Sequence, residues 1–73
     1  GLKITAAIQV CLILDNIITK KREIDGLIEA LNEYKLKEGL ILTLDKEEEL
    51  VLEDKKIIIK PVWKWLLERS LQK

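Results

Sequence analysis

The sequence predicts an α/β fold of mixed type, a small mixed sheet with elements in the order β-α-β-β-β-α, in a single domain spanning residues 1–73. Three observations predict it. An apolar segment with alternating character opens the chain, a stripe with helical spacing follows, and short β-branched runs precede a last amphipathic segment. A strand, a helix and a strand in this order favour a right-handed crossover, so one long crossover helix should join parallel strands.

Residues 2–14 are expected to form the strand around which the sheet is built. The even positions are all apolar: Leu2, Ile4, Ala6, Ile8, Val10, Leu12 and Leu14. The odd positions are mixed, with Gln9 polar and Ala7 and Cys11 small. Apolar residues at both sets of positions are typical of a strand that is covered on both faces. We therefore predict a central strand whose even face is fully buried.

An amphipathic helix is expected next. Its apolar stripe, at spacings of three, four and seven, is Ile17, Ile24, Leu27, Ile28, Leu31 and Tyr34. Asp15, Asn16 or Thr19 can cap its N-terminus, and Gly39 is expected to end it. Gly26 inside the helix costs up to about 1 kcal/mol relative to alanine, and close packing against the strand would account for it.

The second half of the chain predicts three strands and a C-terminal helix. The strands are expected at residues 40–44, 50–52 and 57–59, with a turn at residues 53–55. Pro61 suits the first turn of a helix, where its missing N–H costs nothing. In that helix, residues 62–71, we expect Trp63 and Leu67 to be buried against the sheet and Trp65 to be more exposed.

Composition limits the function classes. Thirteen basic and thirteen acidic residues give a formal net charge of zero, so no overall field attracts nucleic acid or membrane. The absence of histidine removes the commonest zinc ligand and general base. Cys11 is the only cysteine, so no internal disulfide can form. A domain of this size buries only about 60% of its unfolded surface, which favours self-association as a support.

The sequence also predicts where the protein is located, and its composition indicates a hyperthermophile origin. The longest apolar run falls short of the roughly 20 residues that cross a bilayer, and no signal peptide is evident. We therefore expect a soluble, cytoplasmic protein without membrane contact. Abundant Lys and Glu are typical of hyperthermophile proteins.

Lys20, Lys21 and Arg22 form the single basic cluster. Near a helix N-terminus, such cations could accompany a bound phosphate, which gives one hypothesis of weak nucleic-acid binding. The alternative is a solvated turn in which a lysine pairs with Glu23 or Asp25.

Other candidate sites have structural explanations. The acidic run at residues 45–49 lacks the spacing of a calcium loop, so a solvated loop is the better interpretation. Trp63 and Trp65 could stack on bases, but core packing explains them as well. Cys11 has no neighbouring cation in sequence to activate it. No motif indicates a metal, a cofactor or a catalytic group, so we expect no enzyme activity from this chain.

Four segments, IQVCLILDN, TKKREIDGLIEAL, EGLILTLD and IIIKPVWKWLLE, carry a family resemblance. Together they resemble the C-terminal restriction-endonuclease-like domain that follows the ATPase domain in many archaeal AAA-type ATPases. The similarity runs from about Ile8 to Glu68. Its most specific pieces are IQV followed by T-x-x-R-E, with Thr19, Arg22 and Glu23, and the P-V-W-K-W-L-L segment of residues 61–67.

The resemblance implies a PD-(D/E)XK-type nuclease fold with a degenerate active site. In that family an acid and a lysine two residues apart on one strand help to hold a metal. Here Gln9 stands at the acid position and Cys11 at the lysine position, and neither can replace the charge that the chemistry needs. The strand carrying the family's aspartate would lie upstream of Gly1, so a truncated, inactive module is implied. No P-loop is present, and an active metal-dependent nuclease is the disfavoured alternative.

Self-association is expected through the opening strand. In the fold that the sequence resembles, the missing upstream segment would pair with it, which leaves an open edge with little charge. We expect a homodimer in which this strand pairs with its copy. The residues assigned to this surface are Ile4, Ala6, Ala7, Ile8 and Val10. The function predicted is thus a non-catalytic interaction and oligomerisation module, with nucleic-acid binding as the alternative.

Overall fold

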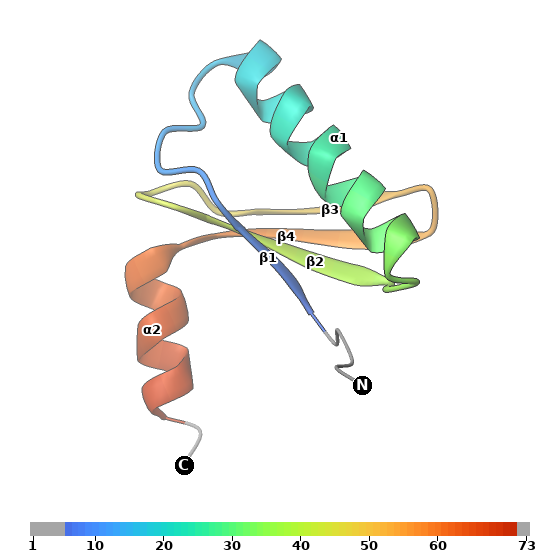
Figure 1. Cartoon of the computed structure of the whole chain (residues 1–73). Coiled ribbons are helices and arrows are strands. Elements are labelled where there is room, and N and C mark those ends of the chain that lie inside the picture. Colours follow the sequence, from blue (N-terminus) through green and yellow to red (C-terminus); the bar gives the residue numbers. More distant parts are fainter. Residues whose placement is uncertain (1–5, 72–73) are drawn as a thin grey trace.

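A four-stranded mixed sheet carries one helix on each face (Figure 1). The computed structural model describes residues 6–71. Its elements are β1 (Ala7–Val10), α1 (Ile17–Glu33), β2 (Glu38–Thr43), β3 (Glu48–Leu52), β4 (Lys55–Pro61) and α2 (Val62–Ser70). The predicted α/β class and the order β-α-β-β-β-α are confirmed.

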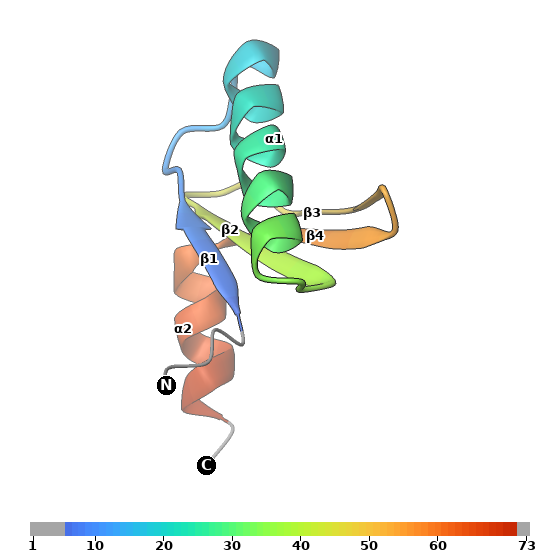
Figure 2. The same ribbon diagram turned by 45° about the vertical axis from the view of Figure 1, so that its right-hand side comes forward.

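The strand order is β1-β2-β4-β3. β1, β2 and β4 run parallel, and β3 pairs antiparallel with β4. In the register, Gln9 is paired with Ile41, and Ile41 with Ile59. Paired residues share a face of the sheet. We call the face that carries this row the α1 face, because α1 packs on it, and the opposite face the α2 face (Figures 1 and 2).

The hydrophobic core lies between α1 and the α1 face. Its buried members are Leu14, Ile24, Leu27, Ile28, Leu31, Ile41, Ile57 and Ile59. Thr43 is fully buried at the end of β2, where its hydroxyl accepts from the Lys46 N–H at 3.0 Å and donates to the Lys46 carbonyl at 2.9 Å. The core is therefore apolar, and its buried hydroxyl is hydrogen-bonded.

The predicted boundary signals of α1 are partly confirmed. Asn16 is the N-cap, and its side-chain oxygen accepts from the Ile18 N–H at 2.7 Å. The prediction that Gly39 ends the helix is wrong. The helix ends at Glu33, and Lys35 adopts the left-handed conformation, with φ 56°, that a glycine usually supplies after a helix.

The close packing predicted at Gly26 is found at Gly39 instead. A Cβ on Gly26 would meet nothing within 4 Å, so close packing does not explain this residue. Gly39 instead lies in β2 beneath Leu27, whose Cδ2 would be only 2.8 Å from an added Cβ. The close approach of α1 to the sheet therefore depends on Gly39.

The opening strand differs most from its prediction. Within the described residues β1 covers Ala7–Val10 and does not continue through residues 11–14, and it pairs on one side only, with β2. Residues 2–5 of the predicted strand lie outside the described residues. Its exposure is also reversed, because Ile8 and Val10 are exposed while Ala7 and Gln9 are half-buried. The prediction of a central strand with a buried even face was thus wrong. The small or polar odd side chains fit beneath α1, which leaves the bulky even ones on the opposite face.

A tight hairpin joins β3 and β4. Glu53 and Asp54 both have positive φ values, 51° and 65°. Two consecutive left-handed residues are typical of the type I′ turn, whose twist matches that of the flanking strands. The predicted turn is confirmed.

α2 packs with the opposite orientation to that predicted. Trp63 is 59% exposed and Leu67 55% exposed, whereas Trp65 is half-buried. The sheet-facing side of α2 carries charges, with Lys64 paired to Glu47 and Glu68 paired to Lys60 at 2.6 Å. These ion pairs hold the charged side of α2 against the sheet, so its apolar side faces solvent.

Candidate self-association surface

The open edge of β1 is the first part of the candidate surface. The Cys11 N–H donates to the Leu42 carbonyl of β2 at 2.9 Å. Because successive residues of a strand direct their N–H and C=O groups to opposite sides, Ala7 and Gln9 also direct theirs toward β2. Ile8 and Val10 therefore direct theirs away from β2, toward the open edge. An edge of this kind is a template for a further strand.

Exposed apolar side chains are the second part. Ile8 is 50% exposed and Val10 62% exposed, and both side chains lie on the α2 face. Leu12 and Ile13 are also largely exposed just beyond the strand. Residues 6–14 include no charged side chain, so nothing along this edge repels a second chain. We call Ile8, Val10 and the open backbone beside them the β1 edge.

A cleft of about 400 Å³ lies next to the β1 edge, between β1 and α2. Ile8 lines one side of it, and Trp65, Glu68 and Arg69 of α2 line the other. The Arg69 guanidinium lies 4.9 Å from the centre of the Trp65 ring, within the range of a cation–π contact. The cleft offers room for apolar side chains from a chain added at the β1 edge.

Gln9 and Cys11, the degenerate positions of the predicted nuclease-like site, lie on the α1 side of the sheet. The Gln9 side-chain amide donates to the Glu23 backbone carbonyl at 2.9 Å and to the Glu23 carboxylate. This contact ties β1 to α1. The Cys11 thiol donates to the Ile13 carbonyl at 3.4 Å. Burial raises the pKa of Cys11, and the Glu23 carboxylate raises that pKa further, so the reactive thiolate is disfavoured.

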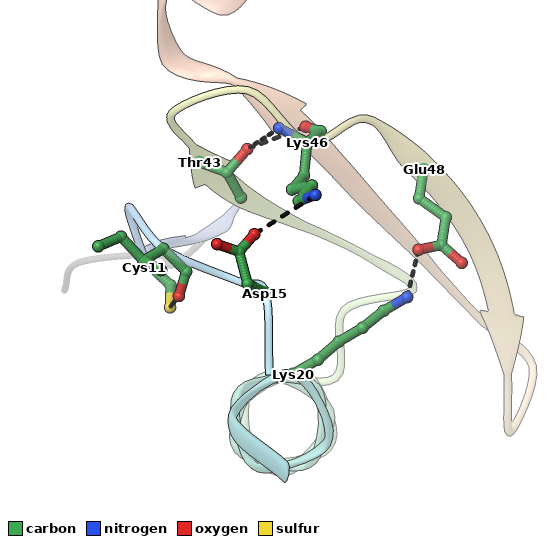
Figure 3. Close-up of polar contacts among 7 residues, drawn as sticks. Cys11, Asp15, Lys20, Thr43, Lys46 and Glu48 are labelled. Atoms are coloured by element: carbon green, nitrogen blue, oxygen red, sulfur yellow. Dashed lines mark hydrogen bonds and ion pairs between the residues drawn. The ribbon is translucent and has the colours of Figure 1, made fainter. Parts of the chain in front are cut away.

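The three residues of the basic cluster lie on different sides of α1. Lys20 reaches across to Glu48 of β3 (Figure 3), and Lys21 pairs with Asp25 at 3.2 Å on α1 itself. Three consecutive helical residues spread over about 200° of the helix surface, so Lys20, Lys21 and Arg22 do not share one face. A phosphate contact of this cluster stays a prediction, and the phosphate would have to compete with the Glu48 and Asp25 carboxylates for the two lysines.

The acidic run is largely paired. Glu47 contacts Lys64, Glu48 contacts Lys20, and Glu49 contacts Lys56 at 3.1 Å. The hydrogen bond to Glu49 raises the pKa of Lys56, and the corresponding bond to Glu47 raises that of Lys64. Nearby, Asp15 pairs with Lys46 at 3.3 Å (Figure 3). Within residues 6–71, no group of three His, Cys, Asp or Glu side chains could hold a metal ion.

The predicted self-association residues are only partly brought together. Ile8 and Val10 are exposed on one face, while Ala7 is half-buried and directed toward α1. Ala6 is exposed at the start of β1, and Ile4 lies outside the described residues. The outward side of α2 was missed, because its 3–4 spacing was interpreted as a core-facing stripe.

Comparisons of the chain with family models, curated proteins and solved structures give no match. The relation to archaeal ATPases therefore stays a prediction. Among the described helices, none has the length and apolar character needed to cross a membrane.

Proposed function

We propose that this chain is a non-catalytic self-association module that pairs with a second copy through the β1 edge. The observation that carries the proposal is a strand edge without charged residues that has no partner among residues 6–71, with exposed Ile8 and Val10 beside it. The amide and thiol at the degenerate positions Gln9 and Cys11 support the non-catalytic part. A cytoplasmic location and descent from an ATPase C-terminal domain belong to the same proposal.

The outward N–H and C=O groups favour one antiparallel register. If a twofold axis passes between the two copies of Gln9, Ile8 lies opposite the partner's Val10 and exchanges both backbone hydrogen bonds with it. Both Ile8–Val10 pairs share the α2 face, so the apolar side chains cover one another beside the cleft that Trp65 lines. Leu12 takes no part in this register, because its carbonyl accepts from the Leu44 N–H at 3.0 Å and so points back toward β2. The same surface is used twice, as an isologous interface requires.

The mass in solution tests the proposal. Sedimentation equilibrium at micromolar concentration should give at least twice the monomer mass of 8.5 kDa. Val10→Lys should abolish β1 pairing, because each lysine would lie opposite the partner's Ile8 and diagonal to the partner's lysine, and a lysine on an edge strand opposes pairing with a further strand. The matched control is Val51→Lys, which places the same charge at the 72% exposed Val51 of the other edge strand, β3. If the native chain were monomeric throughout, or if both variants behaved alike, the β1 edge would not be the interface.

Proline substitutions separate pairing from folding. Ile8→Pro removes an N–H that points to the open edge, so it should prevent pairing while the domain stays folded. Ala7→Pro removes an N–H that points to β2, so it should unfold the domain as well. Ile8→Ala controls for the lost side chain. Circular dichroism reports folding and sedimentation reports pairing; equal effects of the two prolines on folding would contradict the register.

A further inference from the structure

The outward side of α2 is a second uncharged surface. It consists of Trp63, Leu66, Leu67, Ser70 and Leu71, which we call the α2 outer face. Leu66 is 56% exposed and Leu71 77% exposed, similar to the values for Trp63 and Leu67 given above. An amphipathic helix normally turns such a stripe toward the core. Contiguous exposed apolar groups of this kind mark interaction sites.

The charges of α2 are already engaged elsewhere. Lys64 and Glu68 pair with Glu47 and Lys60, and Arg69 lies over Trp65. The α2 outer face therefore has no charged group with which to select a charged partner. A copy of the same neutral face meets no like charge, so self-pairing carries no electrostatic penalty.

We propose that the α2 outer face pairs with the same face of a second copy, as two antiparallel helices about a twofold axis. Apolar residues three and four apart form the ridge by which helices pack against each other. The exposed parts of its four apolar residues come to about 500 Å² per copy, so these residues contribute at most about 1,000 Å² to a twofold pair, close to the lower bound for a specific interface.

This surface is separate from the β1 edge. Pairing at the β1 edge extends the sheet within its own plane, whereas α2 lies on one face of the sheet (Figure 2). The α2 outer face is the exposed side of this helix, opposite the charges that pair with the sheet and the loop before β3. One interface therefore cannot cover the other. A chain with two isologous surfaces assembles beyond the dimer, into a closed tetramer where the two axes intersect and into open chains where they do not.

Single and double variants test the α2 pairing independently of the β1 edge. In the Val10→Lys background, where β1 pairing is removed, the chain should still form dimers. Adding Leu67→Glu should raise the dissociation constant of these dimers by about 30-fold or more, as for a central interface residue. Adding Val51→Glu instead, a control at another exposed site, should leave them intact. A monomeric Val10→Lys chain, or a Leu67→Glu variant that still dimerises in this background, would overturn the α2 pairing without bearing on the β1 edge.

Tryptophan fluorescence provides a second readout that needs no charged variant. With Trp65→Phe, the remaining Trp63 lies at the proposed interface, so its emission should shift to the blue as protein concentration rises. With Trp63→Phe, the remaining Trp65 lines the cleft beside the β1 edge, so any change in its emission should follow β1 pairing and disappear when Ile8→Pro is added. Emission from Trp63 that is independent of concentration would count against the pairing.

Discussion

The two helices of this small domain show the same sequence pattern and opposite packing. α1 and α2 are both amphipathic, and both lie against the same sheet, on its two faces (Figures 1 and 2). α1 buries the middle of its stripe, with Leu27 and Leu31 at 1% and 0% exposure, while Ile17 and Tyr34 at its ends are exposed; no residue of α2 is buried. The difference shows that apolar periodicity identifies a helix with one apolar face but does not say what that face contacts.

The cause of the difference lies in the sheet. The α1 face offers a continuous apolar surface that includes Ile41, Ile57 and Ile59, with Gly39 leaving room for Leu27. The α2 face also carries apolar residues, among them the buried Leu42, but Lys60 of β4 and Glu47 before β3 provide partners for the charges of α2. When α2 packs on this face, its charges form ion pairs with Lys60 and Glu47, although each exposed pair contributes only about 0–1 kcal/mol to stability.

The largest expected effect is the difference in stability between a leucine truncation on α1 and the same truncation on α2. Leu31→Ala should lower the free energy of unfolding by about 2–5 kcal/mol, because it leaves a cavity in the core. Leu67→Ala, the same change on the outer face of α2, should cost about 0.5 kcal/mol or less while the chain is monomeric. Urea denaturation at low protein concentration measures both. Equal losses would mean that α2 is packed as tightly as α1.

A second effect concerns the two glycines around α1. Gly39→Ala should destabilise the domain by about 1–3 kcal/mol, because the added Cβ overlaps Leu27. Gly26→Ala should stabilise it by up to about 1 kcal/mol, because the added Cβ meets nothing and alanine favours the helix. Thermal unfolding of the two variants should thus shift in opposite directions. A destabilising Gly26→Ala would show an unseen close contact at α1.

The element order could be predicted from the sequence because it depends on local signals. Periodicity, the Asn16 cap and the turn at Glu53 and Asp54 act over a few residues. The orientation of β1 could not be predicted in this way. Alternation shows that Ile8 and Gln9 face opposite sides, but the side that α1 covers depends on whether small or large side chains fit beneath the helix.

The orientation of α2 depends on contacts that are distant in the sequence. Lys64 pairs with Glu47 across 17 positions, and this pairing exists only after the sheet has formed. The signal that could have indicated it is the charge on the other side of α2, where Lys64, Glu68 and Arg69 oppose the apolar stripe. The resemblance led us to expect an open edge on the opening strand, and among the described strands β1 does lie at an edge of the sheet; self-association through that edge stays a prediction.

Within α2, the two tryptophans should differ. Trp65→Ala removes a half-buried ring and its contact with Arg69, which should cost about 1–2 kcal/mol. Trp63→Ala removes a mostly exposed ring, so the monomer should lose about 0.5 kcal/mol or less. Urea denaturation gives the free energies, and acrylamide should quench Trp63 more strongly than Trp65 in the monomer. The reverse order of quenching would mean that α2 is rotated about its axis.

The smallest effect concerns the thiol beneath α1. Burial, and then the Glu23 carboxylate, raise the pKa of Cys11 above its ordinary value of 9.0. The folded state therefore holds this proton more tightly than the unfolded state does. The resulting stabilisation is fully present below the unfolded pKa of 9.0, and it is lost as the pH rises through the higher folded pKa.

Alkylation of the thiol measures this shift, because only the thiolate reacts. The rate of reaction of Cys11 with iodoacetamide should rise at a higher pH in the folded protein than in urea. Glu23→Gln removes the negative charge while keeping a side chain of the same size, so it should shift the profile to lower pH. Glu29→Gln, a charge removal elsewhere on α1, should leave the profile unchanged. A folded profile that coincided with the one in urea would show that Cys11 is as hydrated in the folded protein as in the unfolded chain, and α1 would then cover the end of β1 less closely than it covers β2 and β4.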